Sequence, residues 1–376
     1  MLFEEPTLDS QDHAVLEMIR ELWRALRHTL EVSPRTWTGH LAKTLRAKAI
    51  QGSNSIEGYV VTQETALAAL ENEKPADVEP GTWLALTHYR EAMDYILRLG
   101  SAPDFAYTRD LIRSLHFIMA RHYTDKNPGT WRPGYIQVVN GNETVYEGPP
   151  ASDVNGLMQE LCDYLTNEDR AAETRLLRAS MAHLNLVMIH PFSDGNGRMA
   201  RALHTLVIAR SGLLDPTFSS IEEHLGRNTP AYYKVLADVG QGSWNPQNSA
   251  HPWIRFCLKA HYQQARSAQR RLDRVRLIWD EVEKLVETHG LDDRAVPSLV
   301  NAAQGFDIRN ESYRSNADVP MHTASRDLNA LVKAGLLAKV GAKRGAKYRG
   351  GELLQTIGQK HRNRTPVPDP YDGEAT

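Results

Sequence analysis

The stretch from Ile189 to Arg201, IHPFSDGNGRMAR, gathers side chains suited to acid–base, metal and phosphate chemistry. An apolar helix runs up to His190, and Pro191 disfavours helical geometry in the residue before it, so that helix should end there. The apolar spacing after the glycine-rich loop predicts a second helix over residues 197–211. The polar loop is therefore expected between two helices of the core.

Four kinds of group in this stretch point to a phosphate site. A helix that begins after Gly-Asn-Gly exposes unpaired N–H groups and the positive end of its dipole, which attract anions. Arg198 and Arg201 lie three residues apart on one helix face and can clamp further phosphate oxygens. Asp194 offers a hard carboxylate for Mg²⁺ beside the same phosphates. His190 could take the proton of an attacking hydroxyl, which is typically worth about 10²–10⁴ in rate.

Each of these groups alone has a simpler interpretation. The histidine could cap or pack a helix end, the two arginines could form a solvated helix face, and Gly-Asn-Gly could be only a turn. Their conjunction in one short stretch favours a catalytic site. The sequence contains no GxxxxGK[ST], so the phosphate loop is not of the Walker type.

The same stretch resembles the signature of the Fic (Fic/Doc) family, HxFx[DE]GNGRxxR, at every specified position. The resemblance covers roughly residues 35–290, with the catalytic domain at about 105–245. It implies an all-α bundle that transfers AMP from ATP to a Ser, Thr or Tyr hydroxyl. The implied partners are ATP and a protein substrate, which could be the chain itself.

The resemblance also assigns roles by motif position. It implies that His190 is the general base and Asp194 the Mg²⁺ ligand. The other polar positions of the motif are implied to hold phosphates: the Gly195–Gly197 backbone and Asn196 the α- and β-phosphates, Arg198 and Arg201 the outer ones. Phe192 would pack the loop against the core. Gly197 favours adenylylation, because some relatives that phosphorylate carry lysine there. A phosphotransferase is the nearest enzymatic alternative.

One convincing strand pair lies upstream, in GYIQVVNGNETVYEG. Ile136, Val138 and Val139 are expected to face residues 144–146 across Asn-Gly-Asn, whose residues tolerate positive φ. The hairpin at about 135–147 resembles the family's flap, which aligns a target peptide by strand addition. Its candidate contacts are Gln137, Val138, Val139 and Tyr146.

The motif does not define an adenine pocket. Tyr232 and Tyr233, in the sequence TPAYYKVL, are candidates for stacking on the base. Simple packing at a helix start is the alternative.

A possible brake precedes the hairpin. The sequence from Ser53 to Gly58, SNSIEG, resembles the family's inhibitory motif [ST]xxxE[GN]. A glutamate that reached Arg201 would form a charge-assisted pair and occupy the place of the ATP γ-phosphate. We therefore expect Glu57 to inhibit the site from within the chain. The alternative is a surface glutamate that makes only local ion pairs. In some such proteins the same glutamate supports AMP removal, and the sequence does not decide this.

The C-terminal part has a different character. After about residue 291, short helical segments lead to TASRDLNALVKAGLL and then to AKVGAKRGAKYR. This order predicts a capped helix and two short strands around a basic turn, as in a winged helix-turn-helix. DNA binding is the second class of function it suggests, through Arg326, Lys333, Lys343, Arg344 and Lys347, with Ser325 early in the helix. Asp327 beside them argues against it, and such modules also dock proteins.

The fold class predicted overall is mainly α: a Fic-type helical bundle with an inserted hairpin flap, and a small winged helix-turn-helix domain. Apolar residues recur at spacings of three and four from Val15 to Leu30. Further helices are predicted at residues 63–72, 80–98, 108–123, 151–167, 172–189, 197–211 and 250–289. The expected domains are an N-terminal helical region with the inhibitory helix (1–104), a catalytic domain (105–245), a long connecting helix (246–290), a winged-helix-like domain (291–355) and a disordered tail (356–376).

The bulk properties limit the remaining classes. The chain has 376 residues, a net charge of −2 and 41% hydrophobic residues, so a global polycation and a disordered chain are both excluded. No apolar run approaches the roughly 18–20 residues of a membrane helix. Cys162 and Cys257 are expected as free buried thiols. We expect a cytoplasmic location, no membrane contact and, from the resemblance, a homodimer that uses ATP and Mg²⁺.

Overall fold

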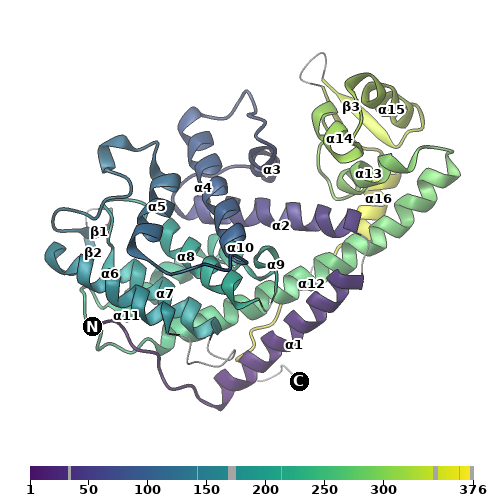
Figure 1. The fold of residues 1–376 in the computed structure, drawn as a ribbon. Helices are drawn as coiled ribbons and strands as arrows, with labels where there is room; N and C mark the ends of the chain where they lie inside the picture. Colours follow the sequence, from purple (N-terminus) through teal and green to yellow (C-terminus); the bar gives the residue numbers. More distant parts are fainter. Residues whose placement is uncertain are drawn as a thin grey trace. The chain divides into compact units, whose positions relative to one another are not determined.

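The computed structural model describes residues 1–32, 35–141, 143–167, 175–212, 214–341, 346–363 and 365–372. The chain forms two compact units. Unit 1 comprises Met1–His28, Leu45–Arg266 and Pro368–Thr376, and unit 2 comprises Thr29–Thr44 and Ser267–Val367. The fold is mainly α, as predicted (Figure 1). Among the helices of the described ranges, none is both long and apolar enough to span a membrane.

The helices that lie wholly or partly in unit 1 surround a central pair. They are α1 (Ser10–Val32), α2 (Arg35–Ile56), α3 (Gln63–Glu71), α4 (Pro80–Leu99), α5 (Arg109–Ala120), α6 (Ala151–Thr166), α7 (Arg175–Ile189), α8 (Asn196–Ser211), α9 (Pro216–Ser219), α10 (Glu222–Arg227), α11 (Thr229–Gly240) and α12 (His251–Thr288), with one turn of 3₁₀-helix at Thr124–Lys126.

The central pair is α7 and α8, which pack along one another in the middle of unit 1 (Figure 1). Nearly every side chain of both helices is buried. Helices α4 and α5 pack on α8, and α6 packs on α7. Burial of this much apolar surface is the main force that holds unit 1 together. It also places the loop between α7 and α8 at the end of two deeply buried helices.

The predicted helices are present, with ends shifted by a few residues. Threonines set two of the starts, because Thr62 accepts a hydrogen bond from the Thr65 amide and Thr108 from the Leu111 amide. The C-terminal end of α2 is polar, and its sequence shows no apolar periodicity. Its residues Gly52-Ser-Asn are nevertheless buried.

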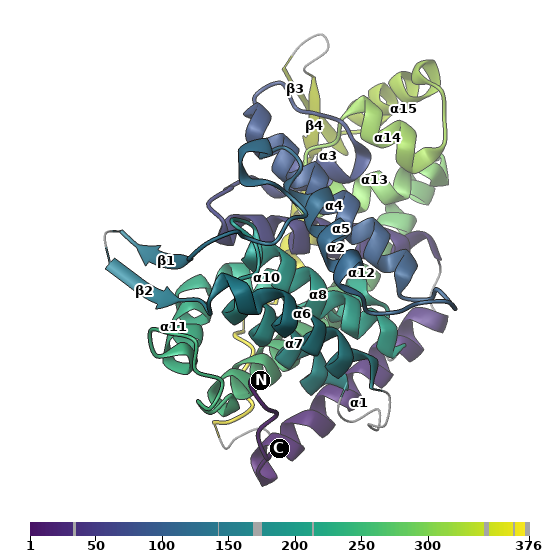
Figure 2. The same cartoon turned by 60° about the vertical axis from the view of Figure 1, so that its left-hand side comes forward.

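The predicted hairpin is confirmed. β1 (Gln137–Asn140) and β2 (Glu143–Glu147) pair antiparallel, and the hairpin extends away from the helices (Figure 2). Val138 lies opposite Tyr146, but Val139 lies opposite Thr144. Strand β2 therefore contains a bulge at Val145, within the pairing predicted between the two segments.

Unit 2 contains the short helices, the longer helix and the two strands predicted for the C-terminal part, in the predicted order, followed by one helix that was not predicted. They are a 3₁₀ turn (Asp293–Ala295), α13 (Val296–Ala303), α14 (Asn310–Ala317), α15 (Met321–Lys333), β3 (Leu337–Val340), β4 (Lys347–Gly350) and α16 (Glu352–Lys360). β3 and β4 pair antiparallel, and Tyr348 also bridges to Ile308. Helix α15 begins at Met321 and has no side-chain cap, unlike the capped start expected near Thr323. Lys343 and Arg344 lie outside the described residues.

The prediction of a disordered tail from residue 356 is wrong for the residues described. Helix α16 continues to Lys360. Further on, the Tyr371 hydroxyl donates to Asp12 Oδ1 at 3.0 Å, and Lys259 forms an ion pair with Asp369. A polar, proline-rich composition cannot predict such contacts, because their partners, Asp12 and Lys259, lie far away in the sequence.

Candidate active site

The loop between α7 and α8 is shaped by two residues of positive φ. Helix α7 ends at Ile189, and His190 follows with φ 51°. Gly195, the N-cap of α8, has φ 77°, a conformation that side chains with a Cβ rarely adopt. Its carbonyl accepts the first bond of the helix, from the Met199 amide at 3.0 Å. The predicted order of helix, loop and helix is therefore confirmed.

His190 is held in the tautomer that a general base needs. Its Nδ1 lies 3.0 Å from the carbonyl oxygen of Val187. Because a carbonyl only accepts, Nδ1 must carry the proton, and Nε2 keeps its lone pair. Burial lowers the pKa of His190 below the ordinary 6.5, against the opposing charges of Glu57 and Asp194. The imidazole is therefore neutral at pH 7.

The two arginines of α8 are buried at the N-terminal end of the helix. Arg198 and Arg201 are 2% and 1% exposed. The Arg198 guanidinium lies against the rings of Tyr59 and Tyr123, at 6.0 and 5.8 Å from their centroids. Within the described ranges, Nε and Nη1 of Arg198 and Nη1 of Arg201 have no hydrogen-bond partner. Buried, unpaired donors beside a helix N-terminus fit an anion with several oxygens.

The predicted contact between the SNSIEG segment and the site is present. Arg201 donates from Nη2 to Glu57 Oε1 at 2.6 Å and to the Ser53 carbonyl at 3.0 Å, and from Nε to Ser53 Oγ at 2.7 Å. Burial opposes the ionisation of Glu57, but Arg201 and Arg198 hold the pKa of its carboxyl below the usual value. Gly58 has φ 88° and ends the helix turn directly after Glu57.

Glu57 lies directly over the start of α8. A Cβ added to Gly197 would stand 2.7 Å from Glu57 Oε1 and 3.1 Å from Arg201 Nη1. The carboxylate therefore occupies the space above Gly197, where an anion bound to the helix N-terminus would lie. Glycine at this position leaves room for such an oxygen.

Asp194 stands at the edge of the same space. Its Oδ1 accepts from the Gly195 amide at 2.6 Å, which fixes the direction of the carboxylate. The remaining carboxylate oxygen can serve a cation, and oxygen ligands suit Mg²⁺. A single carboxylate fits an ion whose other ligands are phosphate oxygens and water.

The Asn196 side chain, predicted to hold phosphate, bonds the backbone of its own loop in the structure. Its Oδ1 accepts from the Phe192 amide at 2.9 Å, and its Nδ2 donates to the Phe192 carbonyl at 2.8 Å. The side chain is 2% exposed and is used to close the loop. Both of its polar atoms are thus engaged by the Phe192 backbone, whereas the backbone of Asn196 itself remains at the helix start. Phe192 is fully buried, as predicted.

The two tyrosines proposed for adenine have different surroundings. Tyr232 is 1% exposed, and its hydroxyl hydrogen-bonds His183 Nε2 at 2.9 Å. Its ring is part of the core, so the prediction that it stacks on the base is wrong. Tyr233 is half exposed, and its hydroxyl donates to the carbonyl of Ile56 at 3.1 Å. That contact places Tyr233 beside the SNSIEG segment.

The hairpin offers some of the predicted contacts. Gln137 and Val139 are exposed and Val138 is partly exposed. Tyr146 is buried, and its hydroxyl donates to the carbonyl of Met188 at 2.8 Å. It therefore fastens the hairpin to the end of α7 and cannot meet a target, which corrects that prediction.

Two residues that shape the loop were not found from the sequence. His116 donates from Nε2 to the Asp194 carbonyl at 2.8 Å, and its ring stacks on Phe192 at 3.6 Å. Arg132 donates to the His190 carbonyl at 2.8 Å and to carbonyls around the hairpin. Both lie far from the motif in sequence, and both act on backbone oxygens. Neither had a sequence signal beyond being a polar residue in an apolar setting.

Comparison with known proteins shows what the central part of unit 1 resembles. Residues 106–208 match the model of the Fic/DOC family. The chain carries a Fic/DOC domain. The fold agrees: a Fic family protein from Desulfovibrio desulfuricans G20 superposes with a TM-score of 0.60 at 22% identity, over 93% of this chain and 98% of that one. Fic-1 (residues 134–508) from C. elegans gives 0.56 at 22% identity, over 69% and 71%.

Named relatives share part of the chain. The protein adenylyltransferase Fic of Nematostella vectensis is 27% identical over 215 residues, which is 56% of this chain and 45% of that protein. The protein adenylyltransferase fic-1 of Caenorhabditis briggsae is 46% identical over 102 residues, 27% and 18% of the two. The chain therefore spans less than half the length of these relatives.

The contribution of the two Asn196–Phe192 hydrogen bonds can be tested by measuring the stability of the protein. Asn196→Ala should lower the free energy of unfolding of the nucleotide-free protein by about 2–4 kcal/mol, because it leaves a buried N–H and a buried C=O of Phe192 unpaired. Urea denaturation measures this. The matched control is Asn155→Ala, whose bonds to Arg109 and Trp131 are exposed. It should cost less than about 1 kcal/mol. Unchanged stability of Asn196→Ala, with weaker ATP binding alone, would restore a phosphate role for the side chain.

Proposed function

We propose that this chain is a protein adenylyltransferase that moves AMP from ATP to a Ser, Thr or Tyr hydroxyl of a protein. The observation that carries the proposal is the neutral His190, with Nε2 available, beside a helix start that holds two buried arginines with unpaired donors. The named relatives are adenylyltransferases, which supports the same reaction. Gly197 lacks the lysine of phosphorylating relatives and favours AMP transfer over phosphate transfer.

The residues divide the reaction between them. The backbone at the start of α8 holds phosphate oxygens, and Arg198 and Arg201 neutralise the charge on them. The target hydroxyl oxygen forms a bond to the α-phosphorus, the bond from that phosphorus to the bridging oxygen breaks, and pyrophosphate leaves. His190 Nε2 accepts the hydroxyl proton. Mg²⁺ on Asp194 would supply charge neutralisation on the phosphates.

We assign to the hairpin the role of positioning the target protein. Val138 and Val139 of β1 lie on a two-stranded sheet, whose outer edge suits an added strand. Arg132 and Tyr146 join the hairpin to the loop that carries His190. A segment bound along β1 would thus be fixed relative to the base.

Glu57 is proposed to inhibit this reaction. The carboxylate already uses Arg201 and covers Gly197, so an outer phosphate must displace it or bind elsewhere. ATP can then be held only in an unproductive position.

A reducing compartment such as the cytoplasm is proposed as the location. Cys162 and Cys257 are both free and buried, as predicted. Free thiols of this kind are ordinary in reducing compartments.

Removal of the glutamate is the direct test. Glu57→Gly, with ATP and Mg²⁺, should carry at least ten times more covalent AMP than wild type, because Arg201 becomes free for phosphate. Intact mass spectrometry of the protein, and of a cell lysate offered as target, measures it. Glu57→Gly with His190→Ala is the control and should carry none. No gain in Glu57→Gly contradicts the brake, and a phosphate-sized adduct would indicate a phosphotransferase.

The pH dependence follows from His190. A general base must be neutral, so activity is present above its pKa and is lost as pH falls through it. Because burial places that pKa below 6.5, kcat/KM of Glu57→Gly should be flat near pH 7 and fall about tenfold per unit below the midpoint. Loss of the Glu57 charge, which raises this pKa, moves the midpoint further down. An acid limb with a midpoint above pH 7 would assign the base to another group.

DNA binding by unit 2 is a second proposal. Asp327, which argued against it, accepts from Arg294 Nε at 2.8 Å and from the Tyr313 hydroxyl at 3.2 Å, and it also pairs with Arg326 at 3.3 Å. The outer face of α15 presents Arg326 and Lys333, both exposed. Cations on a helix face of this kind can meet phosphates.

Fluorescence anisotropy with duplex DNA at low salt tests that proposal. Wild type should bind with an affinity that falls steeply with salt, and Arg326→Ala with Lys333→Ala should lose most of it. Lys234→Ala, an exposed lysine of unit 1, is the control and should bind as wild type does. No binding at low salt would remove DNA as a partner.

A further inference from the structure

The end of α2 that carries the inhibitory segment is fastened to the α10–α11 segment at three points. Lys48 lies 3.5 Å from Glu223 Oε1. The backbone at Gly52 crosses that of α10. The Tyr233 hydroxyl donates to the carbonyl of Ile56, the last residue of the helix. All three points precede Glu57 by a few residues, so they determine where its side chain can reach.

The crossing at Gly52 is closer than any side chain would allow. A Cβ on Gly52 would stand 2.5 Å from the Glu222 carbonyl oxygen and 2.9 Å from Glu223 Cα. A Cβ on Gly226 would stand 2.6 Å from both Cα and O of Gly52. Alanine would be the better residue within either helix by roughly 1 kcal/mol, so local propensity does not explain these glycines. They are explained by the approach of the two backbones.

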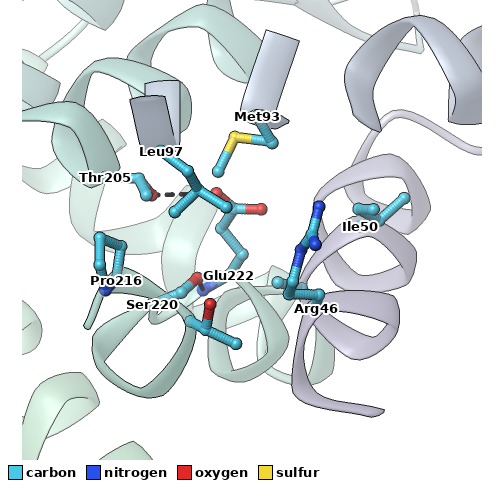
Figure 3. Close-up of a pocket in the computed structure, with 10 residues that line it drawn as sticks. Arg46, Ile50, Met93, Leu97, Thr205, Pro216, Ser220 and Glu222 are labelled. Carbon is cyan, nitrogen blue, oxygen red and sulfur yellow. Dashed lines mark hydrogen bonds between the residues drawn. The ribbon is translucent and has the colours of Figure 1, made fainter. Parts of the chain in front are cut away.

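Packing on another side of α2 is looser. A pocket of about 30 Å³ lies between Arg46 and Ile50 of α2 and Met93, Leu97 and Glu222 (Figure 3). The Glu222 carboxylate accepts from Thr205 at 3.1 Å and has a second oxygen without a partner in the described ranges. This side leaves α2 room to shift by a small amount. The tight crossing at Gly52 therefore sets the position of the helix end.

The Tyr233 contact fixes the last turn. The final carbonyls of a helix have no partner inside it, and the one on Ile56 is satisfied by this hydroxyl. Ile56 is joined directly to Glu57, so a movement of the Ile56 carbonyl moves the glutamate backbone. Tyr233 thereby acts on Arg201 through Glu57, without touching the guanidinium in any hydrogen bond described.

We propose that Gly226 and Tyr233 are positioning residues of the brake: they hold the end of α2 where Glu57 reaches Arg201. The proposal depends on the proposed function only where its test measures AMP transfer. The segment α10–α11 is then the part of the domain through which the brake can be loosened, because a shift of α10 or α11 withdraws the glutamate without any change in the catalytic loop.

The test compares Gly226→Ala and Tyr233→Phe in two backgrounds, wild type and Glu57→Gly. Phenylalanine keeps the ring and removes only the hydroxyl. The matched control is Gly156→Ala, a glycine of α6 whose added Cβ would meet nothing within 4 Å. Covalent AMP is measured by intact mass, and hydrogen–deuterium exchange of the peptide over residues 50–59 is measured on the same samples.

In the wild-type background, Gly226→Ala should raise AMP transfer at least fivefold, and Tyr233→Phe about two- to tenfold, as the loss of one hydrogen bond permits. Both should speed exchange at residues 53–59. In the Glu57→Gly background neither should raise transfer further. Gly156→Ala should match its parent in every measurement.

Three results would overturn the proposal: unchanged exchange at residues 53–59, an equal gain in both backgrounds, or transfer in Tyr233→Phe equal to that of wild type. If Gly226→Ala does not fold, Tyr233→Phe decides alone. If Glu57→Gly itself transfers no AMP, the proposed function fails, and the exchange measurement still decides whether Gly226 and Tyr233 hold the end of α2.

Discussion

The structure depends on one buried cation that needs an anion. Arg201 is 1% exposed and lies beside the N-terminus of α8, so its charge and the helix dipole add. A guanidinium in such a place is costly unless a negative group pairs with it. Glu57 is that group in the structure described: burial alone would lower the pKa of Arg201, but the charge of Glu57 raises it above its ordinary value. On this account ATP and the glutamate compete for one cation.

The rest of the domain confines the competition between ATP and Glu57 to the start of α8. Helices α7 and α8 are almost wholly buried, and the loop between them is closed by Asn196 on the Phe192 backbone and by His116 on the Asp194 carbonyl. The catalytic loop is therefore rigid before any ligand binds, which preorganises donors for a developing charge. The segment that carries Glu57 bonds Arg201 of α8 and is held in addition by Glu223 and Tyr233, so the proposed brake has contacts outside the loop.

The sequence predicted the parts of the site that share a continuous motif. The positions of His190 and Arg201 follow from one short segment with a helix on each side, and local pattern determines both helices. Residues that act across the fold were missed or misjudged. The sequence suggests that Tyr232 is an aromatic residue available at a helix start, but tertiary packing buries it. Arg132 gives no signal, because its partners are backbone carbonyls that any sequence supplies. The predicted homodimer stays a prediction.

Nucleotide binding to proteins with and without Glu57 tests the competition most directly. With His190→Ala in both proteins to prevent transfer, calorimetry would give the Kd of ATP and of ADP for the parent and for Glu57→Gly. Because Glu57 is placed where the γ-phosphate would meet Arg201, the parent should bind ATP and ADP about equally, whereas Glu57→Gly should prefer ATP by tenfold or more, a change of about 1.4 kcal/mol. The same ATP-to-ADP ratio in both proteins would contradict the account, since the glutamate would then not stand in the place of the phosphate.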